Sequence, residues 1–338
     1  MILRPKSLLS RHAVPSGVSS AVPIATVPAW LRKAIPDAQS VADKNVEDVV
    51  LVAGAAIGAL DAVVRRQERW AGAWRQRLAL SAAAVTARQA GRVEDEAALR
   101  DAVLLTKAGD DVGPAGRMIL AWGRLATRPT EDLLTGRNLG AVLEEFGHVP
   151  GDDVVGDLAS ELHRLSAGGM VGMLTGAFIA AERYGFGRVV GTWLADALVA
   201  QRLGWTHAVP LLGAEVIAGL GAPRPRRSGT GIAAASIEDE GARAKSLLAA
   251  QARAALRAVD LSAELGRRSE RLLAVAPKLR ARASDLVVER LLSDDAIVAS
   301  EKIAGMSDRG LRRLLDRLQK LGAARELSGR QTFRIYGL

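Results

Sequence analysis

The chain has 338 residues, which is enough for more than one domain, because single hydrophobic cores rarely grow beyond about 250 residues. It contains no cysteine, which excludes disulfides, cysteine-ligated metal sites and thiol catalysis. The formal charge of +9 favours a polyanionic partner such as nucleic acid. Only 4% of the residues are aromatic, and alanine, leucine and valine predominate among the apolar residues, so we expect a mostly α fold.

Residues 1–42 are expected to be a basic, disordered tail. The first 36 residues contain no acid and five basic residues, which are Arg4, Lys6, Arg11, Arg32 and Lys33. They contain no continuous apolar stretch of the kind found in secretory signals, and no apolar run later in the chain reaches the ~20 residues that span a bilayer. We therefore expect a cytoplasmic protein without a membrane segment.

Residues 43–220 show apolar positions at helical spacing and predict an all-helical bundle domain. Three acids, Glu94 to Glu96, complement the dipole at the start of one helix, and the Gly113-Pro114 pair marks the start of another. The helices are expected at residues 43–66, 70–91, 94–104, 114–129, within 135–156, and at 154–165, 170–184, 189–203 and 211–220.

Residues 221–231, GAPRPRRSGTG, combine proline, glycine and arginine and predict a linker. Residues 232–276 are polar, alanine-rich and free of proline, which predicts a connector of one or two long helices. This connector either pairs with a second copy of the chain, giving a homodimer, or packs onto the preceding bundle.

Residues 277–338 predict a winged helix-turn-helix with a small β-hairpin. Ser284-Asp285 caps a helix with Leu286, Val287, Leu291 and Leu292 on its apolar face. A short second helix is expected over 295–304, with Ile297, Val298 and Ile303 inward, and Gly305 permits the turn that follows it. Ser307-Asp308 begins the third helix, Gly322 ends it, and alternating residues over 323–336 predict two strands.

The charge in this last module is consistent with double-stranded DNA as its partner. Residues 307–338 carry eight basic and three acidic residues, a surplus of +5. The third helix of such a module enters the major groove, and its N-terminal residues reach the base edges. We therefore expect base contacts from Ser307, Arg309, Arg312 and Arg313, and phosphate contacts from Arg317, Ser328, Arg330 and Gln331.

Four segments carry a family resemblance: WAGAWRQRLAL (70–80), GRVEDEAALRDA (91–102), GPAGRMILAW (113–122) and LLSDDAIVASEKIAGMSDRGLRRLLDRLQKLGAARELSGRQTFRIYGL (291–338). Together they resemble a bacterial family of unknown function, catalogued as fourteen-oh-three, that occurs on plasmids and chromosomes. The tail after Met306 is also similar to winged helices appended to Fic-type proteins, although the chain lacks their histidine loop. The resemblance implies a portable DNA-binding module on a helical domain whose role it does not define.

Three functions follow from these patterns. The leading hypothesis is a DNA-binding regulator of transcription or plasmid maintenance, without a cofactor and open to a small-molecule effector. The second is a non-catalytic scaffold whose basic tail recruits a partner. The third is a metal-dependent helical enzyme that uses the acidic and histidine residues of the segment 144–163, in which Glu145 and His148 have Glu-x-x-His spacing. That segment contains Glu144, Glu145, His148, Asp152, Asp153, Asp157, Glu161 and His163.

Overall fold

A computed structural model describes residues 27–37, 39–107, 109–215, 232–330 and 332–338. Within these ranges the chain forms thirteen α-helices and one small sheet, which confirms the expected mostly α class. The helices are α1 (Ala29–Ala34), α2 (Val46–Arg65), α3 (Ala71–Gln89), α4 (Glu96–Leu104), α5 (Gly113–Thr127), α6 (Thr130–Leu133), α7 (Gly136–Glu145), α8 (Asp152–Ser166), α9 (Met170–Arg183), α10 (Gly187–Leu203), α11 (Ile232–Val275), α12 (Ser284–Ser293) and α13 (Asp308–Lys320).

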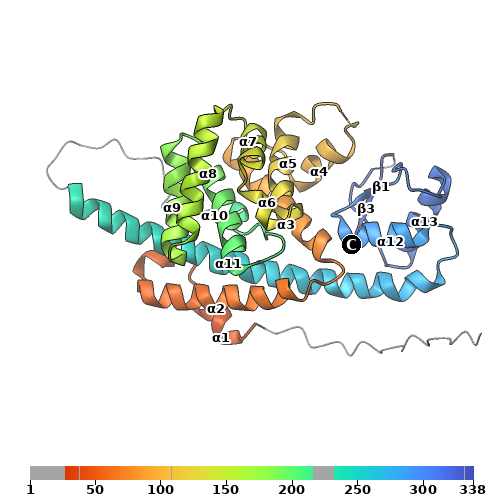
Figure 1. Cartoon of the computed structure of the whole chain (residues 1–338). Coiled ribbons are helices and arrows are strands. Elements are labelled where there is room, and N and C mark those ends of the chain that lie inside the picture. Colours follow the sequence, from red (N-terminus) through yellow and green to blue (C-terminus); the bar gives the residue numbers. More distant parts are fainter. Residues whose placement is uncertain (1–26, 38, 108, 216–231, 331) are drawn as a thin grey trace, which may run out of the picture.

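The longest element is α11, a single helix of 44 residues and about 66 Å at 1.5 Å per residue. It runs below α3 to α10, with α2 alongside it (Figure 1). Leu247, Val259 and Leu272 of α11 are buried in the same core as the leucines of the bundle. The alanine-rich connector therefore packs onto the bundle of its own chain. We call α1 to α11 the helical body.

Local sequence signals explain where several helices begin. Asp95 caps α4 by accepting a hydrogen bond from the Ala98 N–H at 2.8 Å, and Pro114 lies in the first turn of α5. Two short helices were not predicted: α6 follows Pro129, and α1 lies inside the expected tail, where its Leu31 is buried in the core. That part of the tail is therefore ordered. Residues 1–26 and the expected linker at 221–231 lie outside the described residues.

The helix expected at residues 211–220 is replaced, in its described part, by a 3-10 turn at Leu212–Ala214, after which Glu215 is extended. The fully buried carboxylate of Asp196 in α10 accepts hydrogen bonds from the Leu211 and Leu212 N–H groups, each donor being 2.7–3.2 Å from its acceptor. Gly213 lies against the indole of Trp122, where a Cβ would come within 2.2 Å of the ring. These long-range contacts hold a tight turn in place of the helix. Residues 216–220 lie outside the described residues.

After α12 the chain forms a small antiparallel sheet of β1 (Ile297–Val298), β2 (Arg325–Glu326) and β3 (Ile335–Gly337) in the order β1-β3-β2. The two strands expected after Gly322 are present. The short helix expected over 295–304 is wrong, because Ile297 and Val298 are buried in a strand and pair with Tyr336 and Ile335. β-branched residues are well suited to such a position. We call residues 284–338 the C-terminal unit.

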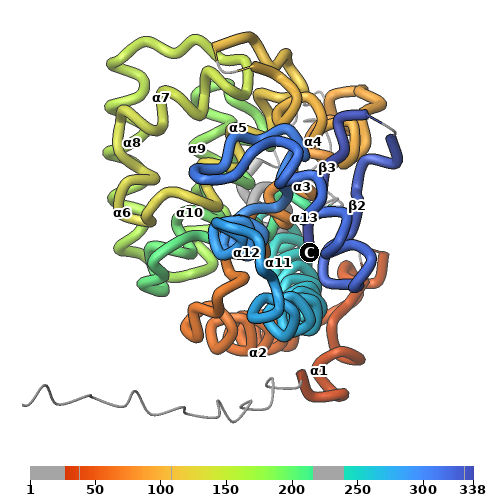
Figure 2. Tube along the Cα trace, turned by 90° about the vertical axis from the view of Figure 1, so that its right-hand side faces the viewer, coloured from red at the N-terminus to blue at the C-terminus, as the bar shows by residue number. Residues whose placement is uncertain are grey.

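The C-terminal unit lies at one end of the helical body, beyond α3 and α4 (Figure 1). A view onto that end shows α12, α13 and the strands in front of the body (Figure 2). Inside the unit, Val287, Leu291 and Leu292 of α12 are buried as expected. Leu286 is 49% exposed, so its predicted place on the apolar face is wrong.

Candidate functional site

The helix α13 is strongly amphipathic. Its first turn is capped by Ser307, whose hydroxyl accepts a hydrogen bond from the Gly310 N–H at 3.2 Å. Leu311, Leu314, Leu315 and Leu318 recur at helical spacing and are buried. This apolar stripe fixes the rotation of the helix and therefore decides which of its side chains meet solvent.

The solvent-facing side of α13 is basic. Its exposed cations are Arg309, Arg312, Arg313, Arg317 and Lys320. Within the described residues none of the five forms an ion pair. The helical acid Asp316 accepts a hydrogen bond from the Tyr336 hydroxyl at 3.0 Å and lies 3.4 Å from Arg334. We call these five cations the α13 basic face. Four of the sequence-predicted contact residues belong to it.

The loop between β2 and β3 contains three more of the predicted contact residues, of which the structure describes Ser328 and Arg330. Glu326 closes its turn by accepting hydrogen bonds from the Ser328 N–H and hydroxyl and from the Gly329 N–H. Burial opposes ionisation of Glu326, but these donors outweigh it and lower its pKa. Arg330 pairs with Asp101 of α4, so it lies against the helical body. Gln331 lies outside the described residues.

Two residues beside the basic face were missed by the sequence reasoning. Phe333 is 64% exposed and has a φ of 54°, a region that bulky residues seldom occupy. With Arg334 it borders a hollow of about 360 Å³ that Arg312 of α13 also lines. The alternation of residues 332–336 indicated a strand, but it carried no signal that Phe333 would be exposed beside α13.

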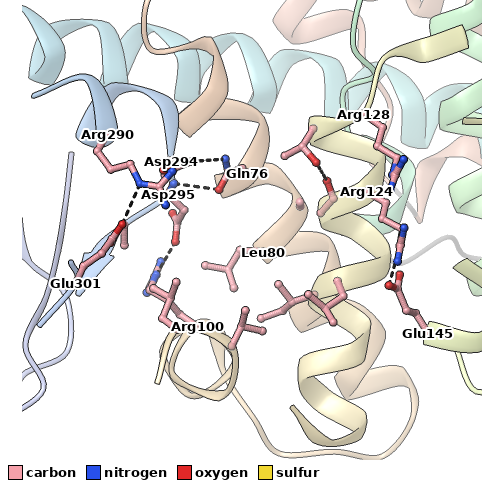
Figure 3. Close-up of a pocket in the computed structure, with 18 residues that line it drawn as sticks. Gln76, Leu80, Arg100, Arg124, Arg128, Glu145, Arg290, Asp294, Asp295 and Glu301 are labelled. Atoms are coloured by element: carbon pink, nitrogen blue, oxygen red, sulfur yellow. Dashed lines mark hydrogen bonds and ion pairs between the residues drawn. The ribbon is translucent and has the colours of Figure 1, made fainter. Parts of the chain in front are cut away.

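The C-terminal unit is fastened to the helical body through Asp295, which follows α12. Its carboxylate pairs with Arg77 of α3 and with Arg100 of α4, whose Nε donates to Oδ2 at 2.6 Å (Figure 3). Only 13% of the Asp295 side chain is exposed. Burial raises the pKa of this carboxyl, but the two guanidinium charges outweigh burial and hold the pKa below its usual value.

Two further contacts support this attachment. The Gln76 side-chain amide donates to the Ser293 carbonyl at 3.1 Å and to Asp294 Oδ1 at 3.0 Å. Val298 and Ile335 of the sheet pack against Leu104 and Leu105 at the end of α4. The orientation of α13 relative to the body is therefore set by buried polar and apolar contacts together.

A pocket of about 550 Å³ lies behind this attachment, between the helical body and the C-terminal unit (Figure 3). Its lining comes from α3, α4, α5, α7 and α12 and from the segment that contains Asp295. Leu80 lies at its centre, with Arg290 and Glu301 on one side and Arg124, Arg128 and Glu145 on the other. A molecule in the pocket would therefore contact both parts of the protein.

The acidic segment 144–163 is not assembled as a metal centre. Glu145 accepts a hydrogen bond from Arg124 Nε at 2.7 Å, and Glu161 pairs with Arg183. The His148 ring packs edge-on against Phe186, with 5.1 Å between ring centroids. Within the described ranges no three acidic or histidine side chains are grouped so as to hold a metal ion.

None of the described helices combines the length and the apolar character that crossing a membrane requires. Comparison with curated proteins gives no match. A family model described as "Protein of unknown function (DUF1403)" matches residues 16–338, which include the helical body, the pocket and the C-terminal unit. The chain therefore belongs to the DUF1403 family.

Proposed function

We propose that the protein binds double-stranded DNA through the α13 basic face. The observation that carries the proposal is the set of five exposed cations on one helix, none of which forms an ion pair within the described residues. Phosphate groups attract such cations and release condensed counterions when they bind. The helix α13 lies at one end of the molecule (Figure 1).

The architecture of the C-terminal unit supports this proposal. Its order of helix, strand, helix and two strands is that of a winged helix without the middle helix, because residues 299–307 form turns and extended chain. In that arrangement α13 is the recognition helix, and Arg309, Arg312 and Arg313 near its N-terminus reach the base edges. Ser307 uses its hydroxyl as the helix cap, so its main contribution is to fix the helix start.

The ion pairs of the loop between β2 and β3 indicate which cations are available to contact phosphate groups. Because Arg330 is paired with Asp101 and Arg334 with Asp316, we assign phosphate contacts first to Arg317 and Lys320, which form no ion pair in the described residues. The fixed orientation of α13 on the body would then set how two copies of the chain present their helices to one duplex. The proposed role is regulation of transcription or of plasmid maintenance in the cytoplasm.

The test is fluorescence anisotropy of a labelled duplex with the full-length protein over a series of salt concentrations. With two or three phosphate contacts, log K should fall with log salt at a slope of about −2 to −3. The double variant Arg312→Ala, Arg313→Ala should lose at least tenfold in affinity, and its salt slope should become shallower wherever the lost contacts were to phosphate.

The matched control is Arg137→Ala, Arg202→Ala, which removes the same charge from exposed positions of α7 and α10. It should keep nearly all of the affinity. If both double variants weaken binding equally, binding depends on net charge and not on α13. If the wild-type protein does not bind duplex DNA at about 100 mM salt, the proposal is wrong.

A further inference from the structure

The pocket between the helical body and the C-terminal unit has the size and the lining of a small-molecule binding site. Its volume of about 550 Å³ is within the ~300–1,000 Å³ range of ligand pockets. The apolar part of its lining consists largely of Leu80, Val103, Leu104, Ile119 and Leu120. Leu120 is 38% exposed, although its neighbour Ala121 in α5 is completely buried. An apolar molecule in the pocket would remove this surface from water.

One end of the pocket carries polar groups that lack hydrogen-bond or ion-pair partners in the described residues. Arg124 Nε donates to Glu145 Oε1, but Glu145 Oε2 is buried and has no hydrogen-bond partner in the described residues. Arg128 lies one turn beyond Arg124 (Figure 3), and within the described residues it forms no ion pair. Two guanidinium groups and one carboxylate give this end a net charge of +1, together with a buried acceptor that lacks a donor.

At the opposite end of the pocket the charged side chains are paired with one another. Arg290 Nε donates to Glu301 at 3.1 Å, and the same guanidinium lies 2.8 Å from Asp294. Arg100 is occupied by Asp295. These charges are neutralised by one another, so the free positive charge of the pocket is at the Arg124 and Arg128 end.

We propose that this pocket binds a small amphipathic organic acid. Its apolar body lies over the leucine, isoleucine and valine side chains, and its acidic group meets Arg124 and Arg128. An N–H or O–H group next to the acid donates to Glu145 Oε2, which removes the cost of an unpaired buried acceptor. Burial raises the pKa of Glu145, against the effect of Arg124, which is consistent with a carboxyl that lacks full solvation. The site does not depend on DNA binding.

The probe is anilinonaphthalene sulfonate, which has an apolar ring system and an N–H group next to a sulfonate. Phenylnaphthylamine has the same rings and N–H but no acid, so it is the neutral control probe. Titration of the folded full-length protein should give saturable fluorescence at one site. The sulfonate should bind about tenfold more tightly than the neutral probe, because hydrogen bonds to charged groups are the stronger ones. Equal affinities would overturn the assignment of an acid.

A blocking variant locates the site. Gly123 of α5 lines the pocket, and a Cβ there would meet no atom within 4 Å, so Gly123→Leu fills the pocket without a clash of its Cβ. Gly54→Leu is the matched control, because Gly54 lies in α2, outside the pocket lining, with equally open surroundings. We expect Gly123→Leu to lose at least tenfold in affinity for the sulfonate and Gly54→Leu to bind like wild type. Unchanged binding by Gly123→Leu would overturn the proposed site.

A second variant tests the polar end. Arg128→Ala should reduce the preference for the sulfonate over the neutral probe severalfold, whereas Arg137→Ala, which removes an exposed arginine outside the pocket lining, should not. An unchanged preference in Arg128→Ala would overturn the role of that end. The sulfonate should also raise the melting temperature of the wild type, because a ligand of the folded state stabilises it. A lowered melting temperature would show binding to unfolded chains and would overturn the site.

Discussion

Substitution of Asp295 by asparagine tests whether buried charge holds the C-terminal unit on the helical body. The change keeps the shape of the side chain but removes the negative charge between Arg77 and Arg100. Removal of one partner from a buried ion pair costs about 3–5 kcal/mol, because the remaining charge stays desolvated. Asp295 and Arg100 are 13% and 10% exposed, so little solvent is available to compensate. We expect a loss of at least about 3 kcal/mol.

The free energy of unfolding should be measured by urea titration followed by circular dichroism, with limited proteolysis reporting release of the C-terminal unit. Glu289→Gln is the matched control: it removes the exposed pair with Arg69, which also joins this unit to the body, with side chains 54% and 61% exposed. Such exposed pairs contribute little. If Asp295→Asn loses no more stability than Glu289→Gln, the carboxylate does not hold the two parts together.

Two further predictions concern the core. Burial raises the pKa of Asp196 to about 7 against three backbone N–H donors, so the folded protein retains a proton that the unfolded chain releases near its ordinary pKa of about 3.9. The stability from this group is therefore complete below about pH 4 and is lost as the pH rises to about 7. The unfolding free energy of Asp196→Asn, measured by urea titration, should rise relative to wild type by about 1.4 kcal/mol per pH unit in that window, and a constant difference would contradict the reasoning. Gly213→Ala should lower the unfolding free energy by about 1–3 kcal/mol, because its methyl group overlaps the Trp122 ring. Gly58→Ala in α2, where a Cβ meets no atom within 4 Å, should raise it by up to about 1 kcal/mol, and equal effects of the two alanines in thermal unfolding would disprove the packing argument.

Much of the local structure was accessible from the sequence because its causes are local. The spacing of leucines in α13 predicts both a helix and its buried stripe, and the structure buries Leu311, Leu314, Leu315 and Leu318. Ser307, the predicted start of α13, accepts a hydrogen bond from the Gly310 N–H, as capping residues do. The cap predicted at Ser284-Asp285 is wrong, because Ala283 is the N-cap of α12 and no side chain in the described residues caps that helix. The same leucine spacing places the arginines between the leucines of α13 on its exposed side.

The candidate site was only partly predictable. The positions of Arg309, Arg312, Arg313 and Arg317 follow from helical periodicity. By contrast, Arg330 lies in the loop between β2 and β3, and its partner Asp101 is more than 200 residues earlier in the sequence. The pocket likewise combines residues from five helices. No local pattern indicates which distant surfaces will meet, so neither of these features was predicted.

The sequence by itself determined the helical class, the Ser307 cap of α13 and the basic face of that helix, because hydrogen bonding and side-chain periodicity within a helix act over only a few residues. Tertiary structure alone decided that Ile297 and Val298 form a strand, that Asp196 holds a turn at Leu212–Ala214, and that Asp295 is buried between two arginines. The physical reason is that strand pairing, desolvation and ion pairing depend on the groups brought alongside by folding.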